Sequence, residues 1–154
     1  MTGRSLTRGE RSLAASMFGV AIDYDAVRLH NRKWWPFQPR NVTMAPDGDI
    51  WFHPQSRMWC GDFCDHGVAE QGLFLHEMTH VWQAQTKGRW YLPIMRHPWC
   101  RYDYRLDPGK PFARYGIEQQ AEIVRHGWMA RRGLVVPDKP GRESYEAVLP
   151  FEVG

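Results

Sequence analysis

Residues 72–85, GLFLHEMTHVWQAQ, place two histidines and a glutamate inside a run that is otherwise apolar. An imidazole or carboxylate that is buried without a partner is costly, so these groups must either face water or share a partner in the interior. His76 and His80 are four residues apart. In a helix both rings then project from one face, about 6 Å apart along the axis. The spacing predicts that the two histidines share a partner such as a metal ion.

The sequence HEMTH also assigns a role to the glutamate between them. In H-E-x-x-H helices the histidines bind zinc, and the glutamate, here Glu77, points to the open side of the ion, where it can accept a proton from water. This composition gives roughly 0.02 chance matches to the pattern in a chain of this length. The alternative is a metal-free core in which the three side chains satisfy one another by hydrogen bonds. We therefore predict one Zn²⁺ ion, bound by His76 and His80, with Glu77 as general base.

A catalytic zinc site takes three protein ligands and keeps one position open, so a third ligand must come from elsewhere. The longer pattern that supplies a third histidine six residues after His80 is absent, because Gln83 and Thr86 stand where glycine and histidine would be required. This excludes one large group of zinc peptidases.

A second expected helix, YGIEQQAEIVRHGW, offers a better third ligand. Glu118 and Glu122 are four residues apart and share a face, beside an apolar stripe that would pack on the first helix. We predict Glu118 as the third zinc ligand and Glu122 as the acceptor for the free ring N–H of a ligand histidine. Alternatively both glutamates face solvent, with Arg125 as a surface partner. The reserve ligands are Asp103 and Asp107.

Periodicity and turn residues predict an α+β fold in one domain over 1–154, with a core over about 6–132 and a tail over 133–154. The turn PDG at 46–48 predicts a hairpin in a small antiparallel sheet, packed on the central HEMTH helix and the second ligand-bearing helix. The other expected elements are a helix over 6–18 with a capping box formed by Thr7 and Glu10, strands in AVRLHN and NVTMAPDGDIWFH, a loop over 54–67, the central helix over 68–87, a loop over 89–112, and a helix from 113 or 117 to 132.

Composition narrows the classes of function. The net charge of +3 is spread among carboxylates, which argues against nucleic acid as a partner. The sequence contains neither the apolar core of a secretory signal nor a run long enough to span a membrane, which predicts a cytoplasmic protein or export by a leaderless route. The three cysteines, Cys60, Cys64 and Cys100, are expected to be reduced structural thiols rather than a disulfide or a second metal site.

The combination of HEMTH and EQQAE resembles the gluzincin metallopeptidases. That resemblance implies a zincin-like hydrolase in which His76, His80 and Glu118 bind zinc, Glu77 is the base and Glu122 orients a histidine. Gluzincins usually have aspartate at the position of Glu122. More closely, the segments WWPFQPRN, LFLHEMTHVWQ and RYGIEQQAEIV resemble bacterial proteins labelled Vgr-related or Rhs-associated. These labels imply a small zinc peptidase that is linked by name to type VI secretion. This resemblance covers about residues 6–132 and implies a protein of the secretion apparatus as a partner.

These features predict a metallopeptidase that cleaves an amide bond in a peptide or protein substrate. An oxyanion donor is also expected, with His126 and Tyr115 as the main candidates and Tyr102 and Tyr104 as further ones. The alternative is a non-catalytic adaptor of the same secretion system, in which a cysteine or His97 closes a structural metal site with a fourth ligand. A third reading is an enzyme that stays inactive until a segment over 89–112 moves.

Overall fold

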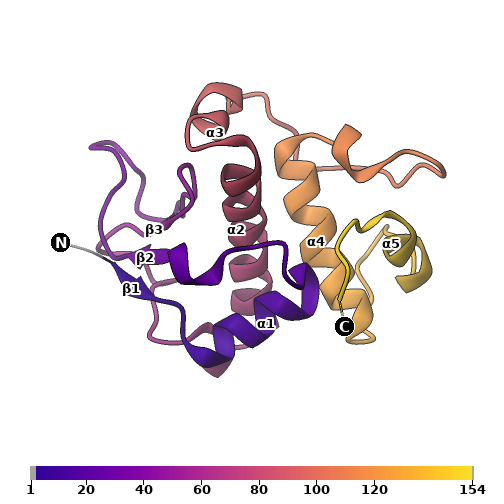
Figure 1. The fold of residues 1–154 in the computed structure, drawn as a ribbon, viewed down its shortest axis with the longest axis horizontal. Helices are drawn as coiled ribbons and strands as arrows, with labels where there is room; N and C mark the ends of the chain where they lie inside the picture. Colours follow the sequence, from indigo (N-terminus) through magenta and orange to yellow (C-terminus); the bar gives the residue numbers. More distant parts are fainter. Residues whose placement is uncertain (1–2, 154) are drawn as a thin grey trace.

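The computed structural model describes residues 3–153, which form an α+β architecture of three short strands and five α-helices. In Figure 1 the helix α2 stands between the sheet and α4, and α5 lies on the outer side of α4. The elements in chain order are β1 (Arg4–Ser5), α1 (Arg8–Phe18), η1 (Tyr24–Ala26), β2 (Arg28–His30), β3 (Ile50–Trp51), η2 (Phe63–Asp65), α2 (Val68–Lys87), α3 (Tyr91–Met95), η3 (Phe112–Arg114), α4 (Ile117–Arg131) and α5 (Arg142–Val148).

The first helix begins where the capping box is predicted. The Thr7 side chain accepts a hydrogen bond from the Glu10 N–H at 3.0 Å, and Glu10 in turn accepts one from the Thr7 N–H at 2.9 Å. Glu10 is fully buried, and its carboxylate pairs with both terminal nitrogens of Arg4 at 2.9 Å. It also accepts the Phe63 N–H, so one capping residue joins β1, α1 and η2.

The sheet is mixed, which corrects the prediction of an antiparallel one. β1 pairs antiparallel with β2, whereas β2 pairs parallel with β3. The expected hairpin is reduced to one antiparallel bridge, between Met44 and Trp51. Residues 31–49 cross over so that β3 runs alongside β2, and the buried Gln38 side chain holds this connection by donating to the Val42 and Trp51 carbonyls. Strands of two or three residues carry too little pattern to reveal such pairing.

The core forms where α2 meets α4 on one side and the sheet on the other. α2 is apolar on most faces and buries Phe74, Leu75, Met78 and Val81. Both long helices lie within a residue or two of their predicted ends, and α2 ends at Gly88 as expected. Within residues 3–153, no helix is both long and apolar enough to cross a bilayer.

Two segments contain short helices that the sequence does not predict. The 89–112 segment contains the short helix α3, whose Leu92 is buried. The tail adds α5 and two aromatic residues to the core. Tyr145 is 1% exposed, and the Phe151 ring packs edge-on against Phe18 with ring centroids 4.9 Å apart.

Candidate metal centre

The helix α2 carries the three HEMTH groups on a buried face. His76, Glu77 and His80 are 7%, 6% and 5% exposed, respectively. The helix α4 packs directly over this face, and the approach is close at Gly72. A Cβ atom there would lie 3.1 Å from the Arg125 Nε of α4. The absence of a side chain at this position therefore helps to bring α4 close to the histidines.

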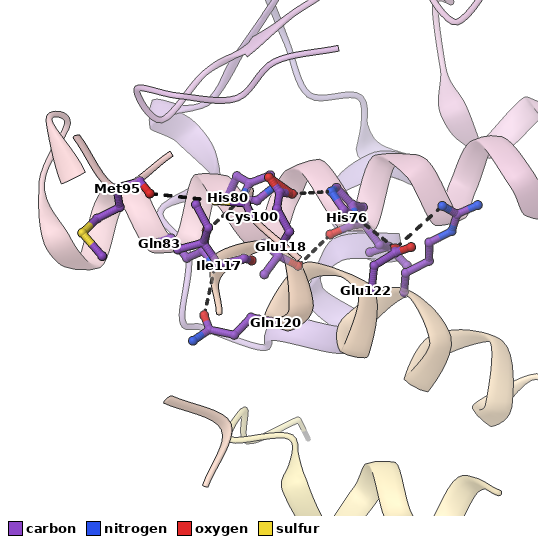
Figure 2. Close-up of polar contacts among 12 residues, drawn as sticks. His76, His80, Gln83, Met95, Cys100, Ile117, Glu118, Gln120 and Glu122 are labelled. Carbon is purple, nitrogen blue, oxygen red and sulfur yellow. Dashed lines mark hydrogen bonds and ion pairs between the residues drawn. The ribbon is translucent and has the colours of Figure 1, made fainter. Parts of the chain in front are cut away.

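Glu118, on the first turn of α4, lies between the two histidines (Figure 2). Its Oε1 atom is 2.8 Å from His80 Nε2 and 3.2 Å from His76 Nε2, and the carboxylate is buried. Within residues 3–153, these three side chains form the group of potential metal ligands, with one donor atom from each lying within 4.8 Å of the others. The structure thus brings together the three residues that the sequence predicts as ligands.

The other ring nitrogen of each histidine is held by an acceptor. His76 Nδ1 lies 3.0 Å from Glu122 Oε2, the contact predicted for that glutamate. His80 Nδ1 lies 2.8 Å from Gln83 Oε1. The Gln83 amide nitrogen donates to the Ile117 carbonyl and to Gln120 Oε1, so its oxygen must face the histidine. Sequence reasoning missed Gln83, although its position three residues after His80 places it on the same helix face.

This arrangement fits a shared cation. With Nδ1–H donating to Glu122 or to Gln83, each neutral imidazole directs its Nε2 lone pair toward Glu118. Two nitrogen lone pairs and a carboxylate oxygen would repel one another at these distances, unless protons or a metal lie between them. A divalent ion would satisfy all three donors, and a mixed histidine and carboxylate set suits Zn²⁺.

The acidic and imidazole groups shift one another's pKa values. Burial alone would lower the pKa of His76, but its hydrogen bonds with Glu118 and Glu122 outweigh this and raise the pKa to about 10. Burial would likewise raise the pKa of Glu118, yet the hydrogen bonds with the two histidines hold it well below its usual range. The pKa of Glu122 is also lowered, against its burial, by the hydrogen bond with His76. In the metal-free chain the cluster therefore holds a proton on His76.

A cavity of about 320 Å³, the metal hollow, opens beside the three ligand candidates. Glu77 lines this hollow, and burial raises the pKa of its carboxyl group, although the neighbouring histidines oppose the rise. Two residues from the 89–112 segment, Arg96 and Tyr102, line it as well. The Tyr102 ring is stacked against His76, with centroids 6.0 Å apart and an interplanar angle of 12°.

The chain matches no family model. Its similarity to individual proteins nevertheless places it in a family. Over 130 residues, 80% of the chain, it is 44% identical to the type VI secretion system spike protein VgrG2b of Pseudomonas aeruginosa. The structure is similar to that of the effector domain of Pseudomonas aeruginosa VgrG2b, with a TM-score of 0.74 and 38% identity, covering 94% of this chain and 80% of that one. The chain belongs to the VgrG2b effector-domain family. The matching region is 13% of the length of VgrG2b itself. The resemblance to Vgr-related proteins is thereby confirmed.

In this VgrG2b-type domain, the residues predicted as oxyanion donors do not all line the metal hollow. Tyr102 reaches the metal hollow, whereas Tyr115 lines a separate cavity beside α5. His126 Nδ1 lies 2.7 Å from the Tyr104 hydroxyl, which in turn contacts Tyr145. Arg96 was not singled out from the sequence, because no periodicity in its broken segment indicates which way its side chain points.

The reserve and alternative ligands of the VgrG2b-type domain lie outside the cluster. Asp103 is exposed and pairs with Lys139 at 2.8 Å, and Asp107 lies near Arg105 on the surface. His97 is exposed, and its Nδ1 accepts the Trp99 N–H. The three cysteines are free thiols that are half-buried.

Proposed function

We propose that this domain is a zinc-dependent peptidase, or amide hydrolase, with a zincin-like fold. One observation carries the proposal: the Nε2 atoms of His76 and His80 converge on Glu118 Oε1, while both Nδ1 atoms are held by acceptors. Glu77 stands beside this cluster and borders the metal hollow. Three ligands and an adjacent carboxylate, with an open cavity in front of them, are what a hydrolytic zinc site requires.

Zinc and Glu77 have separate roles in the proposed hydrolysis. Zinc, when bound, lowers the pKa of a coordinated water toward neutrality and polarises a substrate carbonyl. Glu77 accepts the proton of the attacking water and returns it to the leaving amine. In the metal-free chain, burial raises the pKa of Glu77 above its usual value.

The oxyanion that forms during attack needs a donor, and Tyr102 supports this role best. It lines the hollow, and burial raises the pKa of its phenol, so the hydroxyl keeps its proton and can donate.

The biological setting follows from the family. VgrG2b is named as a spike protein of a type VI secretion system. We infer that the present domain is an effector that is exported with such a spike and that it cleaves a peptide or protein after delivery. Its partners would be a protein of the secretion apparatus and the substrate.

The experiment that tests the proposal combines metal content with cleavage. Zinc per chain is measured by elemental analysis on protein purified without added metal, for the wild type, Glu118→Ala, Glu77→Gln and the exposed control Glu143→Ala. We expect about one zinc in all but Glu118→Ala, because only that change removes a ligand. Cleavage of a peptide library should be lost in Glu118→Ala and in Glu77→Gln.

The outcomes separate the enzyme from an adaptor with a structural metal. A wild type that carries zinc but cleaves nothing, with Glu77→Gln equally stable and equally loaded, favours the adaptor. A wild type without any bound metal contradicts both.

A further inference from the structure

A second cavity adjoins the metal hollow. It has a volume of about 180 Å³, and His80 and Glu118 line both spaces. Apart from these two residues and Arg96, every lining side chain is apolar. We call this cavity the apolar pocket; its principal walls are Trp34, Ala45, Pro46, Leu92, Pro93 and Ile117.

Three separate segments build the apolar walls of this pocket. The crossover between β2 and β3 supplies one wall, α3 a second, and the start of α4 the third. Ala45, Leu92 and Ile117 are 2%, 3% and 8% exposed, so this part of the pocket is fixed by core packing. Trp34 is half-buried at the edge, where its backbone N–H is held by Gln38 Oε1 at 2.8 Å.

The size of the apolar pocket suits one side chain. Sites that enclose a whole drug-sized ligand have volumes of roughly 300–1,000 Å³, well above that of this pocket. A leucine or phenylalanine side chain that leaves water for such a space gains roughly 10- to 150-fold in affinity, whereas an alanine side chain gains little. A carboxylate or ammonium placed there would lose its hydration without compensation.

Arg96 stands where the two cavities meet, since it lines both. Burial raises the pKa of Glu77 and of Tyr102, and the positive charge of Arg96 opposes this rise at both groups. Within residues 3–153, no carboxylate forms a salt bridge with Arg96. The Tyr102 hydroxyl is a polar neighbour of its guanidinium. The remaining N–H groups can donate to an oxygen of a bound molecule, and the fork geometry suits a carboxylate or a carbonyl.

We propose that the apolar pocket and Arg96 form the subsite that selects the substrate. The pocket takes a bulky apolar side chain, such as leucine or phenylalanine, next to the bond that is cleaved. Arg96 donates to a backbone oxygen of the same residue, which is a carbonyl within a chain or the carboxylate at its end. The inference rests on the proposed peptidase function. It predicts that the substrate is an apolar segment of a protein and not a cross-link of peptidoglycan, whose stem peptides are rich in alanine and charged residues.

The first test measures binding without turnover. Alanine-based hexapeptides, with leucine, phenylalanine, alanine or aspartate at the third or fourth position, are titrated calorimetrically into zinc-loaded Glu77→Gln chain. We expect leucine and phenylalanine peptides to bind at least about tenfold more tightly than the alanine peptide, since each methylene in an apolar pocket contributes roughly 10- to 200-fold. Cleavage of the same peptides by the wild type, located by mass spectrometry, should occur next to the bulky residue.

Two variants of the pocket test the assignment to these walls. Trp34→Ala opens the rim and should reduce the leucine-over-alanine preference by roughly fivefold or more. Trp35→Ala is the matched control, because Trp35 is the neighbouring tryptophan, is 43% exposed and does not line the pocket. Ala45→Val narrows the pocket and should reject phenylalanine before leucine. Zinc content should stay at the wild-type level in all three.

Arg96→Met tests the polar part of the subsite. It should weaken the binding of every peptide while leaving the leucine preference unchanged, because it removes the donor and keeps the stem. Peptides that end at the apolar residue, as free acid and as amide, distinguish the two oxygen sources. A loss confined to the free acid assigns Arg96 to a terminal carboxylate, and an equal loss assigns it to a carbonyl.

The subsite and the peptidase can fail separately. Selective binding without cleavage supports the subsite and counts against the peptidase. Cleavage with no preference for bulky residues, or release of fragments from purified peptidoglycan, overturns the subsite while the peptidase stands. Equal effects of Trp34→Ala and Trp35→Ala also overturn it.

Discussion

The residues around the two histidines show how a short motif depends on its neighbours. His76 and His80 each need an acceptor on Nδ1 before Nε2 can serve a metal. Glu122 supplies one and Gln83 the other, from different helices. The resemblance to gluzincins leads one to expect aspartate at the position of Glu122, whose longer side chain reaches His76 at 3.0 Å. The longer side chain is therefore compatible with the orienting role.

At this scale we predict that Glu122→Ala weakens zinc binding. The variant leaves His76 Nδ1 without its acceptor, and losses of such contacts typically reduce metal affinity by 10- to 100-fold. Competition with a fluorescent chelator measures the dissociation constant. Glu143→Ala, on the exposed face of α5, serves as the control and should match the wild type. An unchanged affinity in Glu122→Ala would show that the contact does not orient the ligand.

The pKa of His76 predicts opposite pH trends for metal-free and zinc-loaded protein. Folding raises this pKa from 6.5 to about 10. The resulting stabilisation of the metal-free chain is fully present below pH 6.5 and is lost as the pH rises through 10. Zinc requires the neutral ring, so its affinity for the folded chain should rise by about tenfold per pH unit up to the folded pKa of about 10, while one proton is displaced.

Calorimetric zinc titrations in buffers of different ionisation enthalpy measure that proton directly. The difference in Tm between zinc-loaded and metal-free protein should also widen from pH 6.5 to pH 8.5. A constant difference across this range, with no proton released, contradicts the assignment.

At the scale of elements, α1 illustrates how local and long-range contacts combine. Its capping box depends on residues three apart, and the sequence reveals it. The Glu10 carboxylate of the same box also binds Arg4 and the Phe63 N–H, which no local pattern indicates. The N-terminus of α1 thus anchors both the sheet and the segment that leads into α2.

We predict that Thr7→Ala lowers the free energy of unfolding by about 1 kcal/mol, because the Glu10 N–H loses its acceptor. Equilibrium unfolding in urea measures the change as a lower midpoint with an unchanged slope. Thr86→Ala, at an exposed position in the last turn of α2, is the control and should be close to neutral. A loss equal to that of the control would mean that the cap contributes nothing.

At the scale of the whole molecule, the C-terminal segment closes the core over α1. Phe151 contacts Phe18, Trp82 and Phe112, which belong to three separate parts of the chain. Gly19, at the end of α1, has φ +55°, and a Cβ atom there would clash with the Glu152 carbonyl oxygen. The segment therefore packs against backbone that has no room for a side chain.

We predict that Gly19→Ala destabilises the protein by roughly 1–3 kcal/mol more than Gly88→Ala does. Both glycines have positive φ, but a Cβ atom at Gly88 meets nothing within 4 Å, so only Gly19→Ala must displace the C-terminal segment. Thermal unfolding of the two variants side by side gives the comparison. Equal losses would mean that the segment is not firmly packed in solution.

The sequence by itself determined what short-range geometry controls. The helical period places His76, Glu77 and His80 on one buried face and puts Glu118 and Glu122 on a second helix, and the capping box marks the start of α1. Only the tertiary structure decided what depends on contacts between distant segments. In the folded chain β2 and β3 pair in parallel, and the Gln83 side chain contacts His80. Arg96 lines the metal hollow, whereas Tyr115 lines a different cavity. The physical reason is that periodicity fixes which face of an element is buried, whereas the neighbour that covers that face is set by packing of the whole chain.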